Sequence, residues 1–129
     1  MSISNKPLLR SCLIIAHGSR REGSNDEVRN LASLMRSMTD AFKTIECAFL
    51  EIAQPSIEQG LTKLIAQGST EIIVVPYFLS SGRHVVTDIP EQIEQIRKTH
   101  PDIVIQVTNH IGANPESMAG LLLTEVLNL

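Results

Sequence analysis

Two histidines stand in polar loops that directly follow apolar runs of the sequence. His17 follows "CLIIA" in the segment "AHGSRREG", and His84 lies in "SSGRHVVTD" after "IIVVPYFL". A carboxylate, Glu51, also ends an apolar run. An imidazole in such a loop can coordinate a metal ion or accept a proton, because its pKa lies close to neutrality. These residue types are therefore candidates for metal-ligand or acid–base chemistry.

Three arginines accompany the histidines: Arg20 and Arg21 follow His17, and Arg83 precedes His84. Their guanidinium groups are suited to pairing with carboxylates or phosphates. Each of these residues also has an ordinary interpretation, since a lone histidine or arginine in a loop often only faces water, and Glu51 could mark the polar end of a strand. The other two histidines are weaker candidates: His100 ends a predicted helix, where positive charge is favourable, and His110 follows the last predicted strand.

The elements that must position these residues alternate regularly. Apolar runs predict strands at 9–16, 44–51, 71–79 and 102–109, and 3.6-residue periodicity predicts helices at 24–42, 55–68, 89–98 and 114–129. Ser24 with Glu27 is typical of a capping box, and Asp88 and Asn114 are predicted as helix caps. This (βα)₄ alternation predicts one α/β domain over residues 1–129. Its sheet would be parallel and doubly wound in the order 2-1-3-4, with helices on both faces.

That strand order brings the candidate residues together. Ligands of such sheets bind beyond the carboxyl ends of the strands, at the point where the strand order reverses. Here this point lies between the first and third strands, which end at His17 and near His84. Glu51 ends the second strand, on the other side of the first. We therefore expect these three side chains to lie along one edge of the sheet.

Three chemistries use a His-Gly loop after a first strand. A phosphate-transfer enzyme of the histidine-phosphatase type would have arginine directly before His-Gly, where this chain has Ala16. A dinucleotide site would have G-x-G-x-x-G, which "GSRREG" does not match. Two imidazoles with a carboxylate suit divalent iron, cobalt, nickel or zinc. Metal binding is the interpretation that uses all of these residues.

Composition excludes several other classes of function. The net charge is −3, with one tyrosine, three phenylalanines and no tryptophan, so we expect no nucleic-acid partner. The apolar runs are much shorter than the ~20 residues of a membrane-spanning helix, and the first residues lack a signal-peptide pattern. Cys12 and Cys47 lie in apolar runs without C-x-x-C spacing, which predicts reduced core cysteines in a cytoplasmic protein.

With these residues in place, the chain resembles the short CbiX-type chelatases of the class II tetrapyrrole chelatase superfamily. Four blocks carry the resemblance: "LIIAHGSRREGSNDEV", "AFLEIAQPSIEQGL", "IIVVPYFLSSGRHVVTDIP" and, more weakly, "IGANPESMAGLLL". The resemblance implies a flavodoxin-like half-chelatase fold. It also implies a lyase that inserts Co²⁺, Fe²⁺ or Ni²⁺ into a sirohydrochlorin-type tetrapyrrole, for cobalamin or sirohaem. The metal is then a substrate, and no permanently bound cofactor is expected.

The resemblance also implies roles for individual residues. His17 and His84 match the metal-binding and proton-accepting histidines of the family, and these two are the expected catalytic residues. The expected substrate contacts are Glu51, Leu79, Ser80, Ser81, Gly82, Arg83 and His84. Arg20, Arg21 and Arg83 would supply local positive charge to a ring that carries many carboxylates. The chain departs from the family at Ala113-Asn114, where a Pro-His pair is common.

Two other functions compete with the chelatase interpretation. The same histidine pair could serve a non-catalytic carrier of metal or tetrapyrrole, although such a carrier would favour tight, closed ligation. A generic flavodoxin-like binding module is the other alternative, and the pairing of the two histidine loops argues against it.

The last predicted helix indicates a homodimer. Its apolar residues cover roughly half of the helix circumference, wider than the ~100° stripe that one core requires: Met118, Ala119, Leu122, Leu123, Val126, Leu127 and Leu129. A broad, flat tetrapyrrole also needs two walls, and a four-stranded domain offers one. Short chelatases pair as dimers, so the resemblance points the same way. The alternative is a monomer in which this helix packs deeply.

Overall fold

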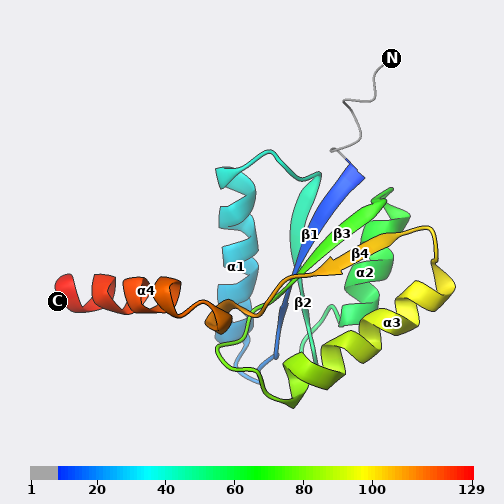
Figure 1. Ribbon diagram of the computed structural model, residues 1–129. Helices are drawn as coiled ribbons and strands as arrows, with labels where there is room; N and C mark the ends of the chain where they lie inside the picture. Colours follow the sequence, from blue (N-terminus) through cyan, green and yellow to red (C-terminus); the bar gives the residue numbers. More distant parts are fainter. Residues whose placement is uncertain (1–8) are drawn as a thin grey trace.

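A four-stranded parallel sheet forms the centre of the protein in the computed structural model, which describes residues 9–129 (Figure 1). Its strands are β1 (Arg10–Ala16), β2 (Thr44–Phe49), β3 (Glu71–Pro76) and β4 (Val104–Val107). They lie in the order β2-β1-β3-β4, and each neighbouring pair is parallel. The predicted α/β fold and strand order are confirmed. Residues 1–8 of the predicted domain lie outside the described residues.

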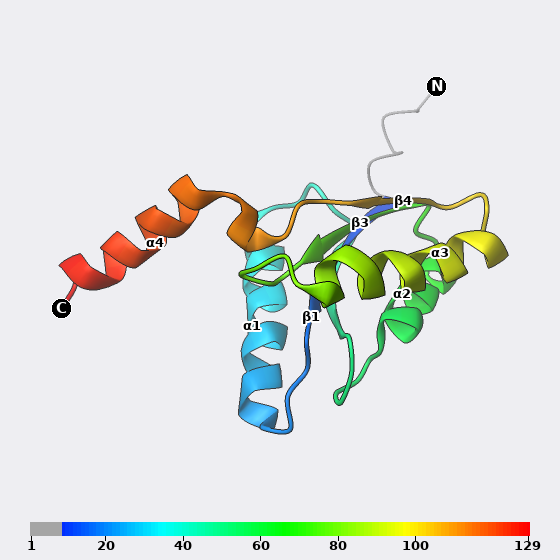
Figure 2. The same ribbon diagram turned by 60° about the horizontal axis from the view of Figure 1, so that its bottom comes forward.

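Three of the four α-helices cover the sheet. The helices are α1 (Glu22–Met38), α2 (Ile57–Ala66), α3 (Ile89–Thr99) and α4 (Pro115–Leu127). α1 lies on one face, α2 and α3 lie on the other, and α4 extends away from the sheet (Figures 1 and 2). A π-helical turn, η2 (His84–Asp88), leads into α3, and a 3₁₀ turn, η3 (Ile111–Ala113), precedes α4. None of the helices within residues 9–129 is long and apolar enough to span a membrane.

The sheet is buried on both faces, which explains its continuous apolar strands. Along β1, Leu13 and Ile15 pack in the core under α2 and α3, whereas Cys12 and Ile14 pack in the core under α1. Both cysteines are buried and free, as predicted. Burial raises the pKa of the Cys12 thiol to about 11, so this side chain behaves as a small apolar core residue.

Helix α2 is fixed at its start and packs closely on the sheet. The Ser56 hydroxyl accepts a hydrogen bond from the Gln59 amide (3.1 Å), and the Gln59 side chain accepts one from the Ser56 amide (2.9 Å). This is a capping box that the sequence analysis did not predict. Further along, a Cβ atom at Gly60 would lie 3.1 Å from the Cβ of Ala48. Glycine at this position therefore lets α2 approach β2 closely.

The predicted capping box at Ser24 and Glu27 is wrong. α1 begins two residues earlier, at Glu22, with Arg21 as its N-cap and no side-chain hydrogen bond at the cap. The earlier start follows from Asn25, whose buried side chain binds both the amide and the carbonyl of Ser19 and holds the preceding turn (2.9 and 2.8 Å). α1 also ends earlier than predicted, at Met38, because the backbone of Thr39 is extended.

Asp88 occupies the N-cap position of α3, as predicted, but its side chain forms no cap hydrogen bond, which corrects a second expectation. Its backbone is helical (φ −65°, ψ −47°) because the chain is already helical from His84 onward. The Asp88 carboxylate therefore faces no free helix terminus and is available to another partner. At α4 the prediction is confirmed: the Asn114 side chain accepts a hydrogen bond from the Ser117 amide (3.1 Å), and Pro115 takes the first helical position.

Candidate functional site

The loops after β1 and β2 meet through their backbones. The amide of Leu50 donates to the carbonyl of Ala16 (2.9 Å), and the amide of Glu51 donates to the carbonyl of His17 (3.1 Å). Gly18 has φ +98°, and a Cβ there would lie 1.9 Å from the carbonyl oxygen of Glu51. Only glycine adopts this φ value without strain and leaves room for that carbonyl oxygen. Gly18 thus permits the close approach that places Glu51 beside His17.

The side chains of His17 and Glu51 are in direct contact. The Nε2 atom of His17 lies 3.0 Å from Oε2 of Glu51, and both side chains remain about half exposed. The other ring nitrogen, Nδ1, lies 3.0 Å from the carbonyl oxygen of Gly18. The Gly18 carbonyl and the Glu51 carboxylate are both acceptors, so a neutral ring can donate to only one of them; with the hydrogen on Nδ1, its Nε2 lone pair faces Glu51. Two electron-rich atoms then face each other, and a proton or a metal cation between them would stabilise the pair.

His84 is held in the same manner by Asp88. Its Nδ1 atom lies 2.8 Å from Oδ2 of Asp88, one turn later in the same helical segment. Since a carboxylate is an acceptor, Nδ1 donates the hydrogen and Nε2 is left available. This is the arrangement in which carboxylates orient metal-binding histidines in proteins.

The two histidines are neighbours. Their ring centroids are 4.9 Å apart, with an angle of 60° between the ring planes. Phe78 lies beyond His84, with its ring centroid 6.4 Å from that of the imidazole. His17, Glu51 and His84 therefore form a cluster at the carboxyl ends of β1, β2 and β3, as expected from the strand order.

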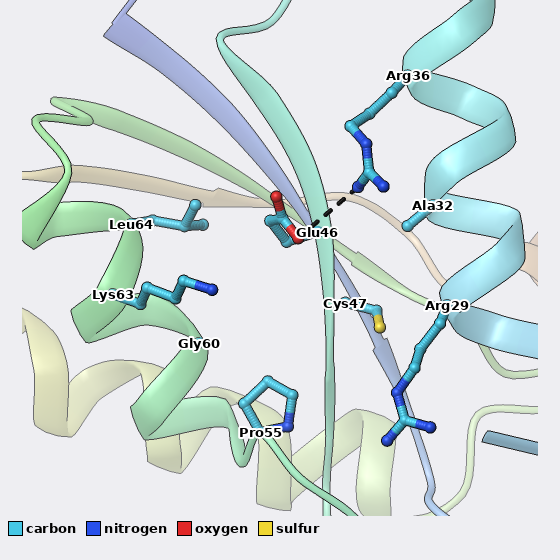
Figure 3. Close-up of a pocket in the computed structure, with 9 residues that line it drawn as sticks. All are labelled: Arg29, Ala32, Arg36, Glu46, Cys47, Pro55, Gly60, Lys63 and Leu64. Atoms are coloured by element: carbon cyan, nitrogen blue, oxygen red, sulfur yellow. Dashed lines mark ion pairs between the residues drawn. The ribbon is translucent and has the colours of Figure 1, made fainter. Parts of the chain in front are cut away.

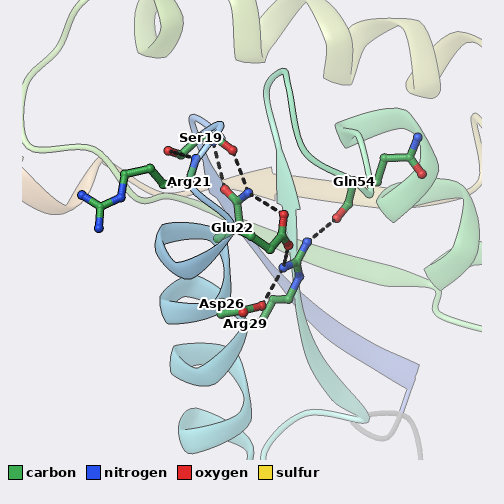
Figure 4. Close-up of polar contacts among 7 residues, drawn as sticks. Ser19, Arg21, Glu22, Asp26, Arg29 and Gln54 are labelled. Atoms are coloured by element: carbon green, nitrogen blue, oxygen red, sulfur yellow. Dashed lines mark hydrogen bonds and ion pairs between the residues drawn. The ribbon is translucent and has the colours of Figure 1, made fainter.

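A network of polar contacts fastens the His17 loop and the loop after β2 to the start of α1 (Figure 4). Arg29 binds Glu22 (2.5 Å) and Asp26 (2.9 Å), and it also donates to the carbonyl of Gln54 (3.0 Å). Its hydrogen bond lowers the pKa of Glu22, with a smaller contribution from Asn25. Ile52, between Glu51 and the tethered Gln54, has φ +72°, a strained value for a β-branched residue. The network therefore holds the loop that carries Glu51 in one conformation.

The 3₁₀ turn η3 packs against the backbone of the loop after β3. Gly112 donates a hydrogen bond to the carbonyl of Phe78 (3.0 Å), and a Cβ at Gly112 would lie 1.8 Å from the carbonyl oxygen of Leu79. On its outer side the loop is open, since Leu79, Ser80, Ser81, Gly82 and Arg83 are all exposed. The exposed Leu79 and the polar residues after it thus lie on a supported loop that leads directly to His84.

The three arginines of the sequence analysis are exposed at the same end of the sheet. Among residues 9–129, no carboxylate forms an ion pair with Arg20, Arg21 or Arg83. In Figure 4 the Arg21 side chain points away from the polar network. These guanidinium groups are therefore available to an anionic ligand.

The cluster is sparse as a metal site. Within the part of the chain that the structure describes, no three or more histidine, cysteine, aspartate or glutamate side chains are gathered in an arrangement that could hold a metal ion. The His17–Glu51 distance is nevertheless compatible with shared coordination. Two ligands at about 2.1 Å from one metal and at right angles to each other are about 3.0 Å apart. Such a pair would leave most of the coordination sphere open.

A cavity of about 260 Å³ lies away from the histidines, at the free edge of β2 (Figure 3). Arg29 and Arg36 of α1 and Lys63 of α2 line it, together with Glu46 of β2. Arg36 is paired with Glu46 (3.7 Å) and also donates to the carbonyl of Ile45, while Arg29 is bound in the network described above. The guanidinium groups of both arginines already have hydrogen-bond or ion-pair partners beside the exposed edge of the strand. We therefore place the functional site at the histidines.

Three residues that shape the cluster were not predicted as site residues. Asp88 resembles a helix cap in the sequence, although its i,i+4 spacing from His84 could have revealed the pair. Gly18 and Gly112 act through close backbone approaches, which no sequence pattern encodes. His110 is partly buried and lines a separate open cleft, between η3 and α4.

The fold and the cluster define an α/β protein of flavodoxin-like topology, with paired histidines and a carboxylate where the strand order reverses. This chain belongs to the CbiX family, which it matches over residues 11–127. Among its relatives, a sirohydrochlorin cobaltochelatase of Sulfurisphaera tokodaii is 34% identical over 110 residues, covering 85% of each chain. A sirohydrochlorin cobaltochelatase of Priestia megaterium is 30% identical over 110 residues, 85% of this chain and 35% of the relative.

A second relative from Priestia megaterium is also longer than this chain. A sirohydrochlorin ferrochelatase of Priestia megaterium is 33% identical over 103 residues, 79% of this chain and 38% of its own length. The chain thus spans little more than a third of the two Priestia relatives.

Solved structures show the same fold. A protein described as a cobalamin (vitamin B12) biosynthesis CbiX protein, from Marinobacter aquaeolei VT8, has a TM-score of 0.75 at 28% identity and covers 92% of both chains. The sirohydrochlorin chelatase SirB of Bacillus subtilis subspecies spizizenii, solved in complex with cobalt, has a TM-score of 0.76 at 33% identity. That match covers 83% of this chain and 45% of SirB.

Proposed function

We propose that this protein is a metal chelatase that inserts Co²⁺ or Fe²⁺ into sirohydrochlorin, with Ni²⁺ as a further candidate. The observation that carries the proposal is the contact of His17 with Glu51, beside the His17–His84 pair. The names of the family relatives support the same substrate class. Metal and tetrapyrrole are both substrates here, and we propose no permanently bound cofactor.

In this proposal the incoming cation takes the position between His17 and Glu51. The Nε2 lone pair and the Oε2 atom, 3.0 Å apart, would replace two of its water ligands. The Nε2 atom of His84, whose ring centroid lies 4.9 Å from that of His17, is available for a third contact. Because the remaining positions stay open, the macrocycle nitrogens can enter and take the metal away.

Insertion also requires two protons to leave the macrocycle. Two pyrrole N–H bonds break as bonds from the ring nitrogens to the metal form, so the cation replaces two hydrogens and the net charge of the ring is unchanged. Histidine suits the acceptor role because its unperturbed pKa lies near the working pH. We assign this role to His17 and His84, which release the protons to the open solvent beside them.

Asp88 positions His84 in this scheme. By accepting the Nδ1 hydrogen at 2.8 Å, it fixes the ring orientation and leaves the Nε2 lone pair free. The Gly18 carbonyl does the same for His17. Both imidazoles are thereby prepared in the tautomer that binds a cation or accepts a proton.

The macrocycle is held by charge and by the loop after β3. Its peripheral carboxylates would pair with the unpaired guanidinium groups of Arg20, Arg21 and Arg83, while Leu79 offers an exposed apolar contact (75% exposed). Glu51 and Ser80, Ser81 and Gly82 complete the proposed substrate contacts. Local positive charge at this edge would compensate for the net charge of −3.

We further propose that the protein works as a homodimer, in the cytoplasm. The single sheet presents one wall to a flat ring, and α4 exposes its apolar side chains to solvent. Both observations support a second copy as the missing part. The two buried, free cysteines fit a reducing compartment.

The decisive experiment is anaerobic incubation of the purified protein with sirohydrochlorin and Co²⁺, Fe²⁺ or Ni²⁺ in turn, followed by absorbance. We expect metal-dependent spectral conversion well above the uncatalysed rate for at least one metal. Stoichiometric binding of metal or tetrapyrrole without turnover would overturn the proposal in favour of a carrier. Binding of neither would leave only a generic binding module.

A further inference from the structure

The backbone at Ile52 forms a strained turn directly after Glu51. Its φ is +72°, and the amide of Ala53 donates a hydrogen bond to the carbonyl of Glu51 (2.8 Å). Together these features define a γ-turn with positive φ, the rare and strained form of this turn. Within residues 9–129, Ile52 is the one residue other than glycine that has a positive φ. A β-branched side chain makes this conformation still less favourable.

Contacts on both sides of Ile52 enforce the turn. The amide of Glu51 is bound to the carbonyl of His17, and the carbonyl oxygen of Glu51 fills the space where a Cβ of Gly18 would lie. On the other side, Ala53 packs against the core under α1. Because Ile52 alone joins these two anchored residues, it must make the whole turn. The strain therefore accompanies the placement of Glu51 beside His17.

This account explains the conformation of Ile52, but not its residue type. Glycine adopts positive φ without strain and would make the same turn. Burial of the isoleucine does not offset the strain, because its side chain is 57% exposed. An exposed apolar residue is ordinary on a protein surface, whereas an exposed isoleucine in a strained turn is not. Strained residues gather at functional sites, so the isoleucine side chain itself is a candidate for contact with a ligand.

The proposed reaction supplies a ligand of matching chemistry. In that reaction the metal passes from His17 and Glu51 to nitrogen atoms at the centre of a flat macrocycle, so one face of the ring must come over this cluster. The carboxylates of the ring lie on its periphery, and its conjugated centre is apolar. The side chain next to a metal ligand would therefore meet an apolar surface. Ile52 directly follows Glu51 and offers an exposed aliphatic side chain.

We propose that Ile52 is a substrate-contact residue whose side chain packs against the face of the tetrapyrrole ring while Glu51 holds the metal. The turn then has two consequences: it places the carboxylate of Glu51 at His17, and it presents the adjacent apolar side chain to the ring. This inference rests on the proposed function and specifies one of its contacts. It predicts that truncation of Ile52 weakens the binding of the macrocycle and leaves the binding of the metal unchanged.

Three substitutions at one position provide the test. Ile52→Ala removes most of the side chain, Ile52→Val keeps a β-branched apolar side chain, and Ile52→Gly removes the side chain and relieves the strain. The matched control is Leu9→Ala, which truncates a partly exposed apolar residue (38%) just before β1, at the opposite end of the sheet. Fluorescence titration gives the affinity for metal-free sirohydrochlorin. Visible absorbance gives the affinity for Co²⁺ without the macrocycle, and urea denaturation gives the stability of the fold.

We expect Ile52→Ala and Ile52→Gly to raise the dissociation constant for sirohydrochlorin by about 10-fold, because an aliphatic contact is lost. Ile52→Val should raise it by at most about 4-fold, since only one methylene is removed. Leu9→Ala should leave it unchanged. The Co²⁺ affinity of Ile52→Ala should equal that of the wild type. Ile52→Gly should unfold at a higher urea concentration than the wild type, because the strain is relieved.

The inference is overturned if Ile52→Ala binds sirohydrochlorin as tightly as the wild type does. A weaker Co²⁺ affinity of Ile52→Ala would also overturn it, since Ile52 would then act by positioning Glu51. So would unfolding of Ile52→Gly at a lower urea concentration, because the isoleucine would then serve the fold. A wild-type protein that binds sirohydrochlorin without inserting metal would contradict the proposed function alone, since these binding measurements require no turnover.

Discussion

At the scale of single residues, hydrogen bonding decides which nitrogen of each histidine is chemically available. Nδ1 of His17 lies against a backbone carbonyl, and Nδ1 of His84 lies against the carboxylate of Asp88. When the hydrogen of each neutral ring is on Nδ1, both Nε2 lone pairs are available. The carboxylate of Glu51 then makes His17 the more favourable position for a cation.

The two histidines should be equally indispensable. His17→Ala or His84→Ala should lower the rate of metal insertion by about 100-fold or more, since each ring contributes both a ligand and a proton acceptor. Folding stability should change little, because both side chains are about 40% exposed. His100→Ala, after the end of α3, is the matched control and should retain full activity. A near wild-type rate in either site variant would contradict the assignment.

Asp88 should act through His84. Asp88→Ala should weaken Co²⁺ binding by roughly 10- to 100-fold, the usual effect of losing a carboxylate that orients a ligand. Asp88→Asn should recover part of the affinity, because an amide oxygen still accepts the Nδ1 hydrogen. A Co²⁺ titration followed by visible absorbance measures both. Equal effects of the two variants, or an equal effect of the exposed control Asp102→Ala, would argue against positioning.

At the scale of elements, glycines and capping side chains fix the loops on which the site depends. Gly18 lets the loops after β1 and β2 touch, and Gly112 lets η3 support the loop after β3. At both positions a Cβ atom would overlap a neighbouring backbone carbonyl, so only glycine permits the contact. The start of α2 is fixed separately, by the reciprocal bonds of Ser56 and Gln59.

A pair of serine variants tests this account of the helix starts. Ser56→Ala should lower the free energy of unfolding by about 1 kcal/mol, because the Gln59 amide loses its acceptor. Ser24→Ala should change it by less than about 0.5 kcal/mol, since Ser24 lies inside α1 and forms no cap. Urea denaturation of both variants gives the comparison. A larger loss for Ser24→Ala would restore the capping box predicted from the sequence.

At the scale of the whole molecule, charge is distributed unevenly. The net charge is −3, yet within residues 9–129 no carboxylate pairs with Arg20, Arg21 or Arg83 at the histidine end of the sheet. Elsewhere, arginines cover the two free edges of the sheet, where Arg36 and Arg97 donate to the carbonyls of Ile45 and Ile105. Only the first group is available to an anionic substrate.

Substitution of these arginines should weaken substrate binding more than catalysis. Arg83→Ala and the double variant Arg20→Ala/Arg21→Ala should raise the KM for the macrocycle with little change in kcat. Added salt should raise the wild-type KM in the same way, because it screens exposed charges. Lys98→Ala, near the end of α3, is the control for loss of one positive charge. A collapsed kcat at unchanged KM would assign the arginines a different role.

The sequence by itself determined the order of the elements and the end of the sheet at which the chemistry lies. Alternating apolar runs and helical stripes encode (βα)₄, and parallel strands place their carboxyl ends at one edge. The convergence of His17, Glu51 and His84 follows from that rule alone. These features are predictable because they depend on periodicity and chain direction, which are local properties of the sequence.

Only the tertiary structure decided how those side chains are held and which surfaces stay open. Asp88 has the residue type and position of a helix cap, but the helical turn before it converts it into a partner of His84. Ser24 matches a cap pattern, but the contacts of Asn25 with Ser19 start the helix earlier. α4 has the pattern of a packed helix, yet it lies free because its connector is bound to Phe78 and Leu79. In the first two cases a short-range contact replaces the predicted cap, and in the third the contact of η3 with the loop after β3 sets the direction of the helix. The geometry of these contacts is set only once the chain is folded.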